Sequence, residues 1–445
     1  MNILHLSALP VWPIAGKGGM PSLEQTLLGH ARAGHEVVLV MPEYHLFSEE
    51  LEVLRPPTRT PYEVHVAPCP WLPAILALRA AGRRLGNRKE LPFAIRWVLN
   101  ALTCVLLTVS LVRAAMLLRR RGRRRFDLVY AHNQYAALAG RIVARMLGAP
   151  NVTRLYGTFL ADLMKKPLVR LRYPVAAAGY LVPHDLLICC NDGTRGDVVA
   201  RELRIDQSRF RFWPNGVDLP AEKPGLTRAD LLELFPASGL RRQSPWILSC
   251  SRLSYWKRID RMLHAVRYAR DRGCDCQLVV AGDGPERGRL AKLAAELGLE
   301  ADAAWLGAVS HDQIWALMHA CDVFMITNDV TNRCNPLYEA MCAGVPVVTV
   351  RDPSSADLVE HEANALLADR DDTQELGRCL VRLLTDAKLA GRLRQGQLER
   401  AAGLWSWQER MNEEVRELER LVARGPLNPC WNPVELITGR GRPQA

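Results

Sequence analysis

Two cations, Arg252 and Lys257, follow the short apolar run Ile247–Cys250 and come just before a segment of helical period that begins at Arg258. The apolar run predicts a strand, so both cations are expected where a strand passes into a helix. The positive end of the helix dipole would reinforce them there. Such a pair suits a diphosphate that gains negative charge as it leaves a broken bond. The alternative interpretation is two solvated charges at the start of a helix.

Two glycine-containing turns also have two interpretations. Gly282-Asp283-Gly284-Pro285-Glu286 follows the predicted strand Leu278–Ala281, and Gly18-Gly19 lies in a loop after the predicted strand Ile3–Leu6. Glycine permits the backbone to approach a phosphate closely, and proline and glutamate are good residues for the first turn of a helix. Either turn can instead be an ordinary connection between a strand and a helix.

A polar loop follows the predicted strand Val323–Ile326 and passes into a helix expected over Leu337–Ala343. Glu339, early in that helix, offers a carboxylate for ribose hydroxyls, and the helix N–H groups suit a phosphate. Glu339 can instead simply favour the helix N-terminus. The loop and the start of the helix run Asp329-Val330-Thr331-Asn332-Arg333-Cys334-Asn335-Pro336-Leu337-Tyr338-Glu339.

The elements that would position these residues follow a simple pattern. Short apolar runs alternate with segments of helical period, which predicts an α/β fold of parallel sheets with crossover helices. The expected strands are Ile3–Leu6, Val37–Val40, Val64–Val66, Asp127–Ala131, Val152–Leu155, Leu186–Cys189, Phe210–Trp213, Ile247–Cys250, Leu278–Ala281, Ala303–Leu306, Val323–Ile326 and Val345–Val350. The expected helices are Pro21–Ala33, Arg258–Arg270, Glu286–Leu297, Asp312–Ala320, Leu337–Ala343 and Trp407–Val422.

The length of the chain and a proline-containing linker indicate two domains. A chain of 445 residues exceeds what one core usually supports, and Pro220–Pro224 reads as a linker. We therefore expect two Rossmann-like, doubly wound domains at 1–219 and 220–405, a helix over 406–424 that crosses back, and a loose tail over 425–445.

A helical segment over 91–125 departs from plain α/β alternation. Trp97 to Val112 carries no charged residue, and the cluster Arg119-Arg120-Arg121-Gly122-Arg123-Arg124-Arg125 follows it. A bilayer-spanning helix needs about 20 apolar residues, so the uncharged stretch suits a membrane interface or an interdomain groove better than a full crossing. The arginines would then meet anionic head groups. The alternative is a buried core helix followed by a solvated charged turn.

Composition limits the partners and the compartment. The net charge of +11, with a pI of about 9.2, suits a phosphate-bearing partner or an anionic membrane, although an arginine-rich genome would also produce it. The twelve cysteines lack the paired spacing of a zinc site and indicate a reducing compartment. The start Met1 to Leu6 reads as a strand and not as a secretory signal, so we expect a cytoplasmic protein. The arginine cluster lacks interleaved aromatics, so no nucleic-acid partner is expected.

Taken in order, the motifs resemble glycosyltransferase family 4, whose retaining enzymes have the GT-B fold of two Rossmann-like domains facing a cleft. The resemblance covers roughly residues 1 to 420 and rests on order and spacing together. It is carried by Gly18-Gly19, by His132 after Asp127-Leu128-Val129-Tyr130-Ala131, by Pro214-Asn215-Gly216-Val217-Asp218, by Ser251-Arg252-Leu253 with Lys257, by Gly282-Asp283-Gly284-Pro285, and by the run from Asn335 to Val348.

The resemblance implies a role for each matching residue. Arg252 and Lys257 would grip the donor diphosphate, Glu339 would bind ribose, and His132 would lie near the transferred sugar. The resemblance also implies that the leaving phosphate helps to deprotonate the acceptor hydroxyl, that no metal is needed, and that there is no cofactor beyond the nucleotide-sugar substrate. The residues expected to contact the donor are Gly18, Gly19, Arg252, Lys257, Gly282, Asp283, Asn335, Pro336, Leu337, Tyr338 and Glu339.

The chain departs from the family pattern at one position. The family usually has two glutamates separated by seven residues, and here the first position is Thr331 and the second is Glu339. The missing carboxylate commonly contacts the donor sugar, so its absence bears on donor identity and on catalysis. Asp329, Thr331 and Asn332 are candidates for those contacts, and we favour altered recognition over an inactive enzyme.

The function expected from these observations is transfer of a hexose from a nucleoside-diphosphate sugar to a lipid-linked or polysaccharide acceptor. The setting would be cell-envelope or exopolysaccharide biosynthesis, in the cytoplasm or on the inner face of the cytoplasmic membrane. The alternatives are a noncatalytic nucleotide-sugar-binding subunit and a nucleotide-sugar epimerase on the same fold. Binding without turnover would distinguish the noncatalytic subunit.

Overall fold

The computed structural model divides the chain into two compact units, residues Met1–Asn215 with Trp407–Ala445, and residues Gly216–Ser406. It describes residues 1–9, 11, 20–44, 46, 53–54, 59–86, 92–122, 124–217, 225–331 and 333–427. The Gly18-Gly19 turn, the linker Pro220–Pro224, Asn332 and most of the expected tail lie outside the described residues.

The described part of the first unit is built on a sheet of seven parallel strands in the order β3-β2-β1-β4-β5-β6-β7. These strands are β1 (Asn2–Ser7), β2 (Glu36–Pro42), β3 (Glu63–Ala67), β4 (Leu128–His132), β5 (Asn151–Leu155), β6 (Leu186–Cys190) and β7 (Phe210–Trp213). The apolar runs form strands because alternate residues are buried on opposite faces of the sheet, as in a parallel sheet covered on both sides. Each strand expected in the first domain is confirmed.

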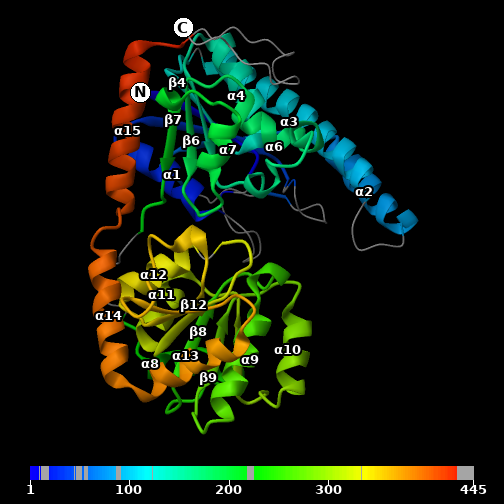
Figure 1. Ribbon diagram of the computed structural model, residues 1–445. Helices are drawn as coiled ribbons and strands as arrows, with labels where there is room; N and C mark the ends of the chain where they lie inside the picture. The colour runs from blue at the N-terminus through cyan, green and yellow to red at the C-terminus, as the bar shows by residue number, and fades with distance from the viewer. Residues whose placement is uncertain are drawn as a thin grey trace. The chain divides into compact units, whose positions relative to one another are not determined.

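Helices cover both faces of this sheet (Figure 1). Leu4 and Leu6 of β1 pack into a core with α3 (Phe93–Gly122) and α4 (Gln134–Leu147), whereas Ile3 lies on the opposite face in a core with α15 (Trp407–Arg424). The described helices of the unit are α1 (Pro21–Arg32), α2 (Leu72–Gly86), α3 (Phe93–Gly122), α4 (Gln134–Leu147), α5 (Val169–Arg172), α6 (Pro174–Leu181), α7 (Gly196–Glu202) and α15 (Trp407–Arg424).

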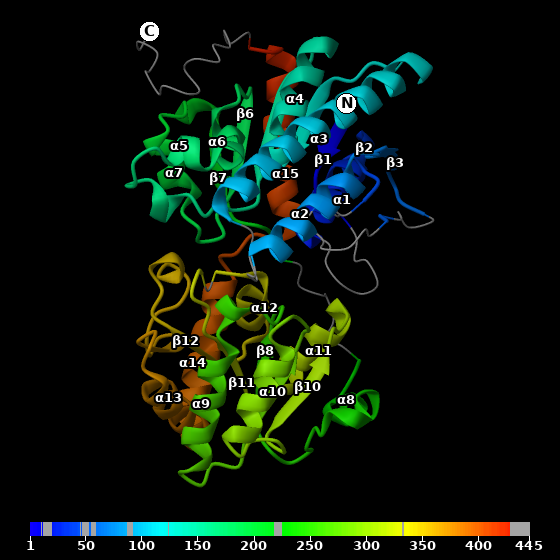
Figure 2. The same ribbon diagram turned by 90° about the vertical axis from the view of Figure 1, so that its right-hand side faces the viewer.

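The segment that departs from plain alternation is one continuous helix, α3, which runs beside α2 and α4 (Figure 2). Leu107, Leu111 and Ala115 are fully buried in the core, which favours the core-helix interpretation for this face. The alternative interpretation put a charged turn after a core helix, whereas Arg119, Arg120 and Arg121 form the last turn of the helix itself. Among the described residues, α3 is the one helix that is long and apolar enough to cross a membrane. Its most apolar stretch of 18 residues is 39% buried.

The described part of the second unit has six parallel strands in the order β10-β9-β8-β11-β12-β13. The strands are β8 (Trp246–Cys250), β9 (Gln277–Ala281), β10 (Ala303–Gly307), β11 (Val323–Ile326), β12 (Val347–Val350) and β13 (Ala365–Ala368). The helices are α8 (Arg228–Leu234), α9 (Ile259–Arg270), α10 (Arg287–Glu296), α11 (His311–Ala320), α12 (Asn335–Ala343), α13 (Thr373–Thr385) and α14 (Ala387–Ala401). Buried strand residues alternate between one core with α9 and α13 and another with α11 and α12.

The sequence did not lead us to expect strand β13, or the helices α2, α4 to α8, α13 and α14. The helices α13 and α14 nevertheless begin with recognisable capping residues. The side chain of Asp372 accepts a hydrogen bond from the N–H of Glu375 at the start of α13, and Asp386 accepts from the N–H groups of Lys388 and Leu389 at the start of α14. Aspartate preceding an apolar periodic segment is a usual signal for a helix N-terminus.

Candidate functional site

The loops that follow β8, β9 and β11 lie at the same edge of the second sheet, because the carboxyl ends of parallel strands meet there. Backbone hydrogen bonds join them. Leu253 N–H donates to Asp283 O at 3.0 Å, and Asp329 N–H donates to Trp256 O at 2.9 Å. The three loops singled out from the sequence therefore form one structure.

Arg252 and Lys257 lie at this edge and have no anionic partner among the described residues. Arg252 is exposed, and Lys257 ends the short 3-10 turn Tyr255–Lys257 with its Nζ 4.1 Å from the ring centre of Trp256. Burial lowers the pKa of Lys257, with an opposing effect of Cys334. Cys334 directly precedes α12, so Lys257 and the first turn of α12 are near each other.

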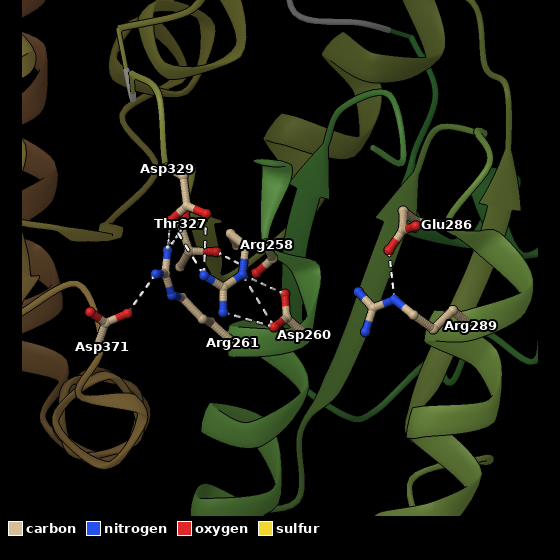
Figure 3. Close-up of polar contacts among 8 residues, drawn as sticks. All are labelled: Arg258, Asp260, Arg261, Glu286, Arg289, Thr327, Asp329 and Asp371. Atoms are coloured by element: carbon tan, nitrogen blue, oxygen red, sulfur yellow. Dashed lines mark hydrogen bonds and ion pairs between the residues drawn. The ribbon is translucent and has the colours of Figure 1, made fainter. Parts of the chain in front are cut away.

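The neighbouring arginines differ because carboxylates neutralise them (Figure 3). Arg258 pairs with Asp260 at 3.0 Å and with Asp329 at 3.2 Å, and Arg261 pairs with Asp329 at 2.7 Å and with Asp371 at 2.8 Å. The carboxylate of Asp329, which was a candidate for a sugar contact, is thus held by two guanidinium groups. Arg258 and Arg261 were not singled out from the sequence, since nothing in their spacing separates them from Arg252.

The same network fixes the backbone around Lys257. Thr327 Oγ1 donates to Arg258 O at 2.8 Å, and Arg258 itself has a positive φ of 52°. A left-handed conformation is unfavourable for a side chain of this kind and persists where surrounding contacts determine it. The ion pairs with Asp260 and Asp329 supply those contacts, so the turn that carries Lys257 is held in place.

The glycines after β9 are required by packing between loops. A Cβ atom on Gly282 would lie 1.9 Å from Ser251 O, and one on Gly284 would lie 2.4 Å from Leu253 O. Gly282 also has a φ of 141°, which L side chains rarely adopt. These contacts support the ordinary structural interpretation of the turn, and donor contact by Gly282 and Asp283 stays a prediction.

Helix α12 presents a free N-terminus and a buried acid. The side chain of its N-cap residue, Cys334, makes no hydrogen bond to the first N–H groups, and Pro336 lies in the first turn. Glu339 is 8% exposed, and its Oε2 has no hydrogen-bond partner in the part of the chain that the structure describes. Its Oε1 is 4.0 Å from Nδ1 of His311, which was not singled out from the sequence. Burial raises the pKa of Glu339, and His311 opposes this effect.

An unpartnered buried carboxylate oxygen is costly, and a ligand that supplies hydrogen-bond donors would remove this cost. A residue that served only the helix dipole would lie at the surface in the first turn, whereas Glu339 is the fifth residue of α12 and faces inward. Leu337 and Tyr338 are buried in the core, so their side chains serve packing.

Thr331, at the position of the absent glutamate, is tied to the segment that follows β12. Its Oγ1 lies 2.9 Å from Ser354 Oγ and accepts from the N–H of Arg333 at 3.0 Å. The guanidinium of Arg333 pairs with both oxygens of Asp357 at 2.8 and 3.0 Å and donates to the hydroxyl of Tyr338. These hydrogen bonds hold the loop in place although position 331 carries no carboxylate.

His132 belongs to the first unit, where it ends β4. It is fully buried, with Nε2 2.8 Å from His5 Nδ1 and Nδ1 2.8 Å from the hydroxyl of Tyr156. Burial, and then the nearby charge of Arg154, hold the pKa of His132 well below its ordinary value. Burial also lowers the pKa of His5, and His132 and His30 add to this effect. Both rings are therefore neutral near pH 7.

These two histidines predict a loss of stability in mild acid. The unfolded chain protonates both below about pH 6.5 while the folded chain does not, so unfolding takes up protons and the free energy of unfolding falls as pH decreases. The expected slope approaches about 1.4 kcal/mol per pH unit for each histidine. Urea unfolding between pH 7.5 and 5 measures it, with exposed His264→Gln as a control that keeps the slope. A constant free energy of unfolding over that range would contradict the prediction.

The described residues contain no group of three or more histidines, cysteines, aspartates or glutamates arranged to hold a metal ion. Each cysteine among them is a free thiol, and most are buried. The expectation that the reaction needs no metal stays a prediction.

Comparison with known proteins gives two family models that together span more than half of the chain. "Glycosyltransferase Family 4" matches residues 94–220, and "Glycosyl transferases group 1" matches residues 232–400. The chain is 29% identical over 279 residues to 2-deoxystreptamine glucosyltransferase of Streptomyces kanamyceticus, covering 61% of this chain and 72% of that protein. It is 26% identical over 283 residues to the Escherichia coli UDP-Gal:alpha-D-GlcNAc-diphosphoundecaprenol alpha-1,3-galactosyltransferase, covering 63% and 71%.

A solved structure has the same fold. HepE of Anabaena, crystallised with UDP, has a TM-score of 0.64 at 20% identity, covering 94% of this chain and all of that one. The expected class of fold, two Rossmann-like parallel-sheet domains of the GT-B type, is confirmed.

Proposed function

Since the chain belongs to glycosyltransferase family 4 and is a glycosyltransferase, we propose that it moves a hexose, with retention of configuration, from a nucleoside-diphosphate sugar to a lipid-linked or polysaccharide acceptor. The observation that carries this proposal is the set of unsatisfied charges at one sheet edge. Arg252 and Lys257 are without anionic partners among the described residues, and Glu339 Oε2 is buried without a donor. A nucleoside diphosphate carries the complementary groups, namely phosphate oxygens and ribose hydroxyls.

Each group would have a distinct task in the transfer. The bond between the anomeric carbon and the diphosphate oxygen breaks, and negative charge grows on the leaving phosphate, where Arg252 and Lys257 stabilise it. The acceptor oxygen forms its bond to the same face of the anomeric carbon, and its proton passes to the departing phosphate oxygen. Glu339 accepts hydrogen bonds from the ribose. In this proposal the two cations take the place of a metal ion and no cofactor takes part.

The sugar itself would be recognised by neutral groups. The loop offers the hydroxyl of Thr331 and the amide of Asn335, while the carboxylate of Asp329 is held by Arg258 and Arg261. Because hydroxyl and amide groups can also bind a sugar, we favour a changed sugar preference over a loss of activity. Asn332, outside the described residues, stays a candidate.

The test is incubation with a panel of UDP-, GDP- and ADP-sugars, followed by thermal unfolding and by analysis of the products. A donor at 100 times its dissociation constant stabilises the fold by about 2.7 kcal/mol. Stabilisation by one donor, with a product that keeps the anomeric configuration when a polyprenyl-linked or polysaccharide acceptor is added, supports the proposal. Stabilisation without turnover would favour the noncatalytic subunit, and conversion of the donor sugar without an acceptor would favour the epimerase.

A membrane surface is the second part of the proposal, because α3 leaves an apolar stripe exposed. Val98, Leu102, Val105 and Val109 recur every three or four residues and are 39 to 59% exposed. The exposed arginines Arg119 to Arg121 lie at the end of the same helix. An apolar face followed by a basic cluster is typical of helices that lie in the interface of an anionic bilayer.

A second segment extends this surface at the opposite end of α3. Trp97 Nε1 donates to Leu171 O at 2.8 Å, which brings the segment after η1 (Ala161–Leu163) beside the start of α3. Leu168 is 72% exposed there, and its neighbours Lys165, Lys166 and Arg172 are exposed cations. An exposed leucine among exposed cations suits the interface of the same anionic bilayer. We place the enzyme on the inner face of the cytoplasmic membrane, in cell-envelope or exopolysaccharide synthesis.

The membrane proposal predicts a loss of binding when the charge on α3 is removed. Replacing Arg119, Arg120 and Arg121 by glutamine removes about 1 kcal/mol of attraction each, so partitioning onto phosphatidylglycerol vesicles is expected to fall about 100-fold. Vesicle co-sedimentation at fixed salt measures this. The matched control replaces three exposed arginines of α14, namely Arg392, Arg394 and Arg400, and is expected to sediment like the parent protein. Equal sedimentation of both triple variants would contradict the proposal.

A further inference from the structure

Exposed aromatic and aliphatic side chains gather where the start of α3 meets the segment that forms α5. The rings of Phe93 and Phe159 each meet the ring of Tyr173 edge to face, with ring centres 6.1 and 5.2 Å apart, and we call these three residues the aromatic cluster. Trp97 Nε1 donates to Leu171 O at 2.8 Å and joins α3 to the same segment. The apolar residues here that are 38 to 72% exposed are Phe93, Trp97, Phe159, Leu168 and Leu171. Single exposed apolar residues are ordinary, but a contiguous group of them marks an interaction site.

Contacts between loops fix the position of Phe159. Thr158 N–H donates to Thr194 Oγ1 at 2.9 Å. Gly157 has a φ of 117°, and a Cβ atom on it would lie 2.2 Å from Asp192 Oδ2. The loops after β5 and β6 are thus packed against each other at the carboxyl end of the first sheet, where open parallel sheets bind their ligands. Phe159 therefore belongs to an edge at which a substrate is expected.

Leu168 is held in an unfavourable conformation beside this group. Its φ of 57° lies in the left-handed region, which a leucine side chain rarely adopts. Val169, the next residue, is buried in a core with Leu155 and Leu160 and anchors the turn. Backbone strain of this kind gathers at binding sites, where it serves a function. We therefore count Leu168 as part of the binding surface.

Cations border the apolar residues on the same segment. Lys165 and Lys166 are exposed and have no ion pair among the described residues. The guanidinium carbon of Arg172 lies 4.8 and 6.0 Å from two ring centres of the aromatic cluster. The one acid between the end of β5 and α5, Asp162, pairs with Arg195 at 3.8 Å. The three cations suit the two negative charges of a diphosphate diester better than the single charge of a phospholipid phosphodiester.

We propose that this surface binds the lipid part of the acceptor, namely a polyprenyl chain that is joined to the glycan through a diphosphate. The chain lies against the aromatic cluster, and the diphosphate pairs with Lys165, Lys166 and Arg172. The exposed stripe of α3 begins at Val98, directly after Trp97, so the rest of the chain follows it into the bilayer. The inference rests on the proposed function, and of its two acceptor classes it selects the lipid-linked one.

The first experiment measures binding of farnesyl diphosphate, a short polyprenyl diphosphate, to the whole chain by isothermal titration calorimetry. No vesicles are present, and the ligand is kept below its micelle-forming concentration. The protein carries Arg252→Ala and Lys257→Ala, so that a diphosphate does not bind at the proposed donor site. Farnesyl diphosphate is expected to bind at least about 10-fold more tightly than inorganic pyrophosphate, because the chain adds apolar contact area.

Two pairs of substitutions in this background divide the site into its apolar and its charged part. Phe159→Ser with Leu168→Ser removes exposed apolar surface, and Lys165→Gln with Lys166→Gln removes charge. Each pair is expected to weaken binding of farnesyl diphosphate about 10-fold or more. The apolar pair is expected to leave the weaker binding of pyrophosphate unchanged, since pyrophosphate has no chain.

Matched controls replace residues of the same kinds in the second unit. Leu234→Ser removes an exposed leucine of α8, and Arg392→Gln with Arg394→Gln removes two exposed arginines of α14. Both controls are expected to bind farnesyl diphosphate like the background protein, and thermal unfolding checks that every variant is folded. Unchanged binding in either pair at the site would overturn the proposal, as would pyrophosphate that binds as tightly as farnesyl diphosphate.

A comparison with vesicles separates the lipid-linked acceptor from the bilayer itself. If the apolar pair loses only its partitioning onto phosphatidylglycerol vesicles and still binds farnesyl diphosphate like the background protein, the surface is a membrane contact and the proposal fails. Binding in solution needs no turnover, so it judges this inference even if no donor is found and the proposed function fails. Transfer to a polysaccharide without any binding of farnesyl diphosphate would overturn the inference and leave the proposed function standing.

Discussion

The variant with both Arg252→Ala and Lys257→Ala is expected to lose essentially all transfer activity, with kcat lowered at least about 100-fold by either single change. The two cations face charge that appears on the leaving phosphate as the glycosidic bond breaks, so their effect is largest in the transition state. A preorganised donor of this kind contributes on the order of 3 kcal/mol. Initial rates with the donor identified by the panel measure the loss.

A matched control separates this role from a general effect of positive charge. Lys292→Ala with Arg392→Ala removes two exposed cations of the same unit, so its rate should stay near that of the parent protein. Arg258 is no suitable control, because its pairs with Asp260 and Asp329 hold the loop. Near-normal rates in the double variant at positions 252 and 257 would refute the role in diphosphate stabilisation.

Glu339→Gln is expected to weaken donor binding by roughly 10- to 150-fold, since a hydrogen bond to a charged group contributes about 1.5 to 3 kcal/mol. The glutamine keeps the volume of the side chain and one acceptor but loses the charge that two ribose hydroxyls would share. Titration of the donor, followed by tryptophan fluorescence or by thermal unfolding, measures the dissociation constant. Glu339→Ala is expected to lose at least as much affinity.

The same change should leave the empty protein as stable as the parent or more stable. Glu339 Oε2 is buried without a partner among the described residues, and burial raises the pKa of the group, so the ionised form destabilises the fold. Higher stability together with weaker binding is the expected signature of a residue kept for function. Glu300→Gln, an exposed acid of the same unit, is the control. Unchanged donor affinity in Glu339→Gln would remove the residue from the site.

Most of the fold could be predicted from local sequence patterns. Each expected strand is present, because short apolar runs between polar segments suit strands that are buried on both faces. The segment after β12 was not assigned, although Asp372 and Asp386 begin its helices. Helix α3 shows the limit of composition, because Leu107 faces the core while Val109, two residues later, is 59% exposed.

The candidate site could be predicted only in part. Spacing identified Arg252, Lys257 and Glu339, because each follows a strand at the edge where parallel strands end. It did not show that Arg258 is paired with Asp260 and Asp329 while Arg252 has no anionic partner among the described residues. His311 and Arg333 were missed because their partners, Glu339 and Asp357, are 28 and 24 residues away in the chain.

By itself the sequence determined the family, the two parallel sheets and the loops proposed to bind the donor, because these depend on short-range periodicity and on motif order. Only the tertiary structure decided which charges are neutralised and which are left for a ligand, since ion pairs such as Arg258 with Asp329 join residues 71 apart. It also decided that Glu414, 284 residues after Tyr130, shares a buried network with His132. The energy of a charge depends on its burial and on its partners in space, and neither can be read from its neighbours in the chain.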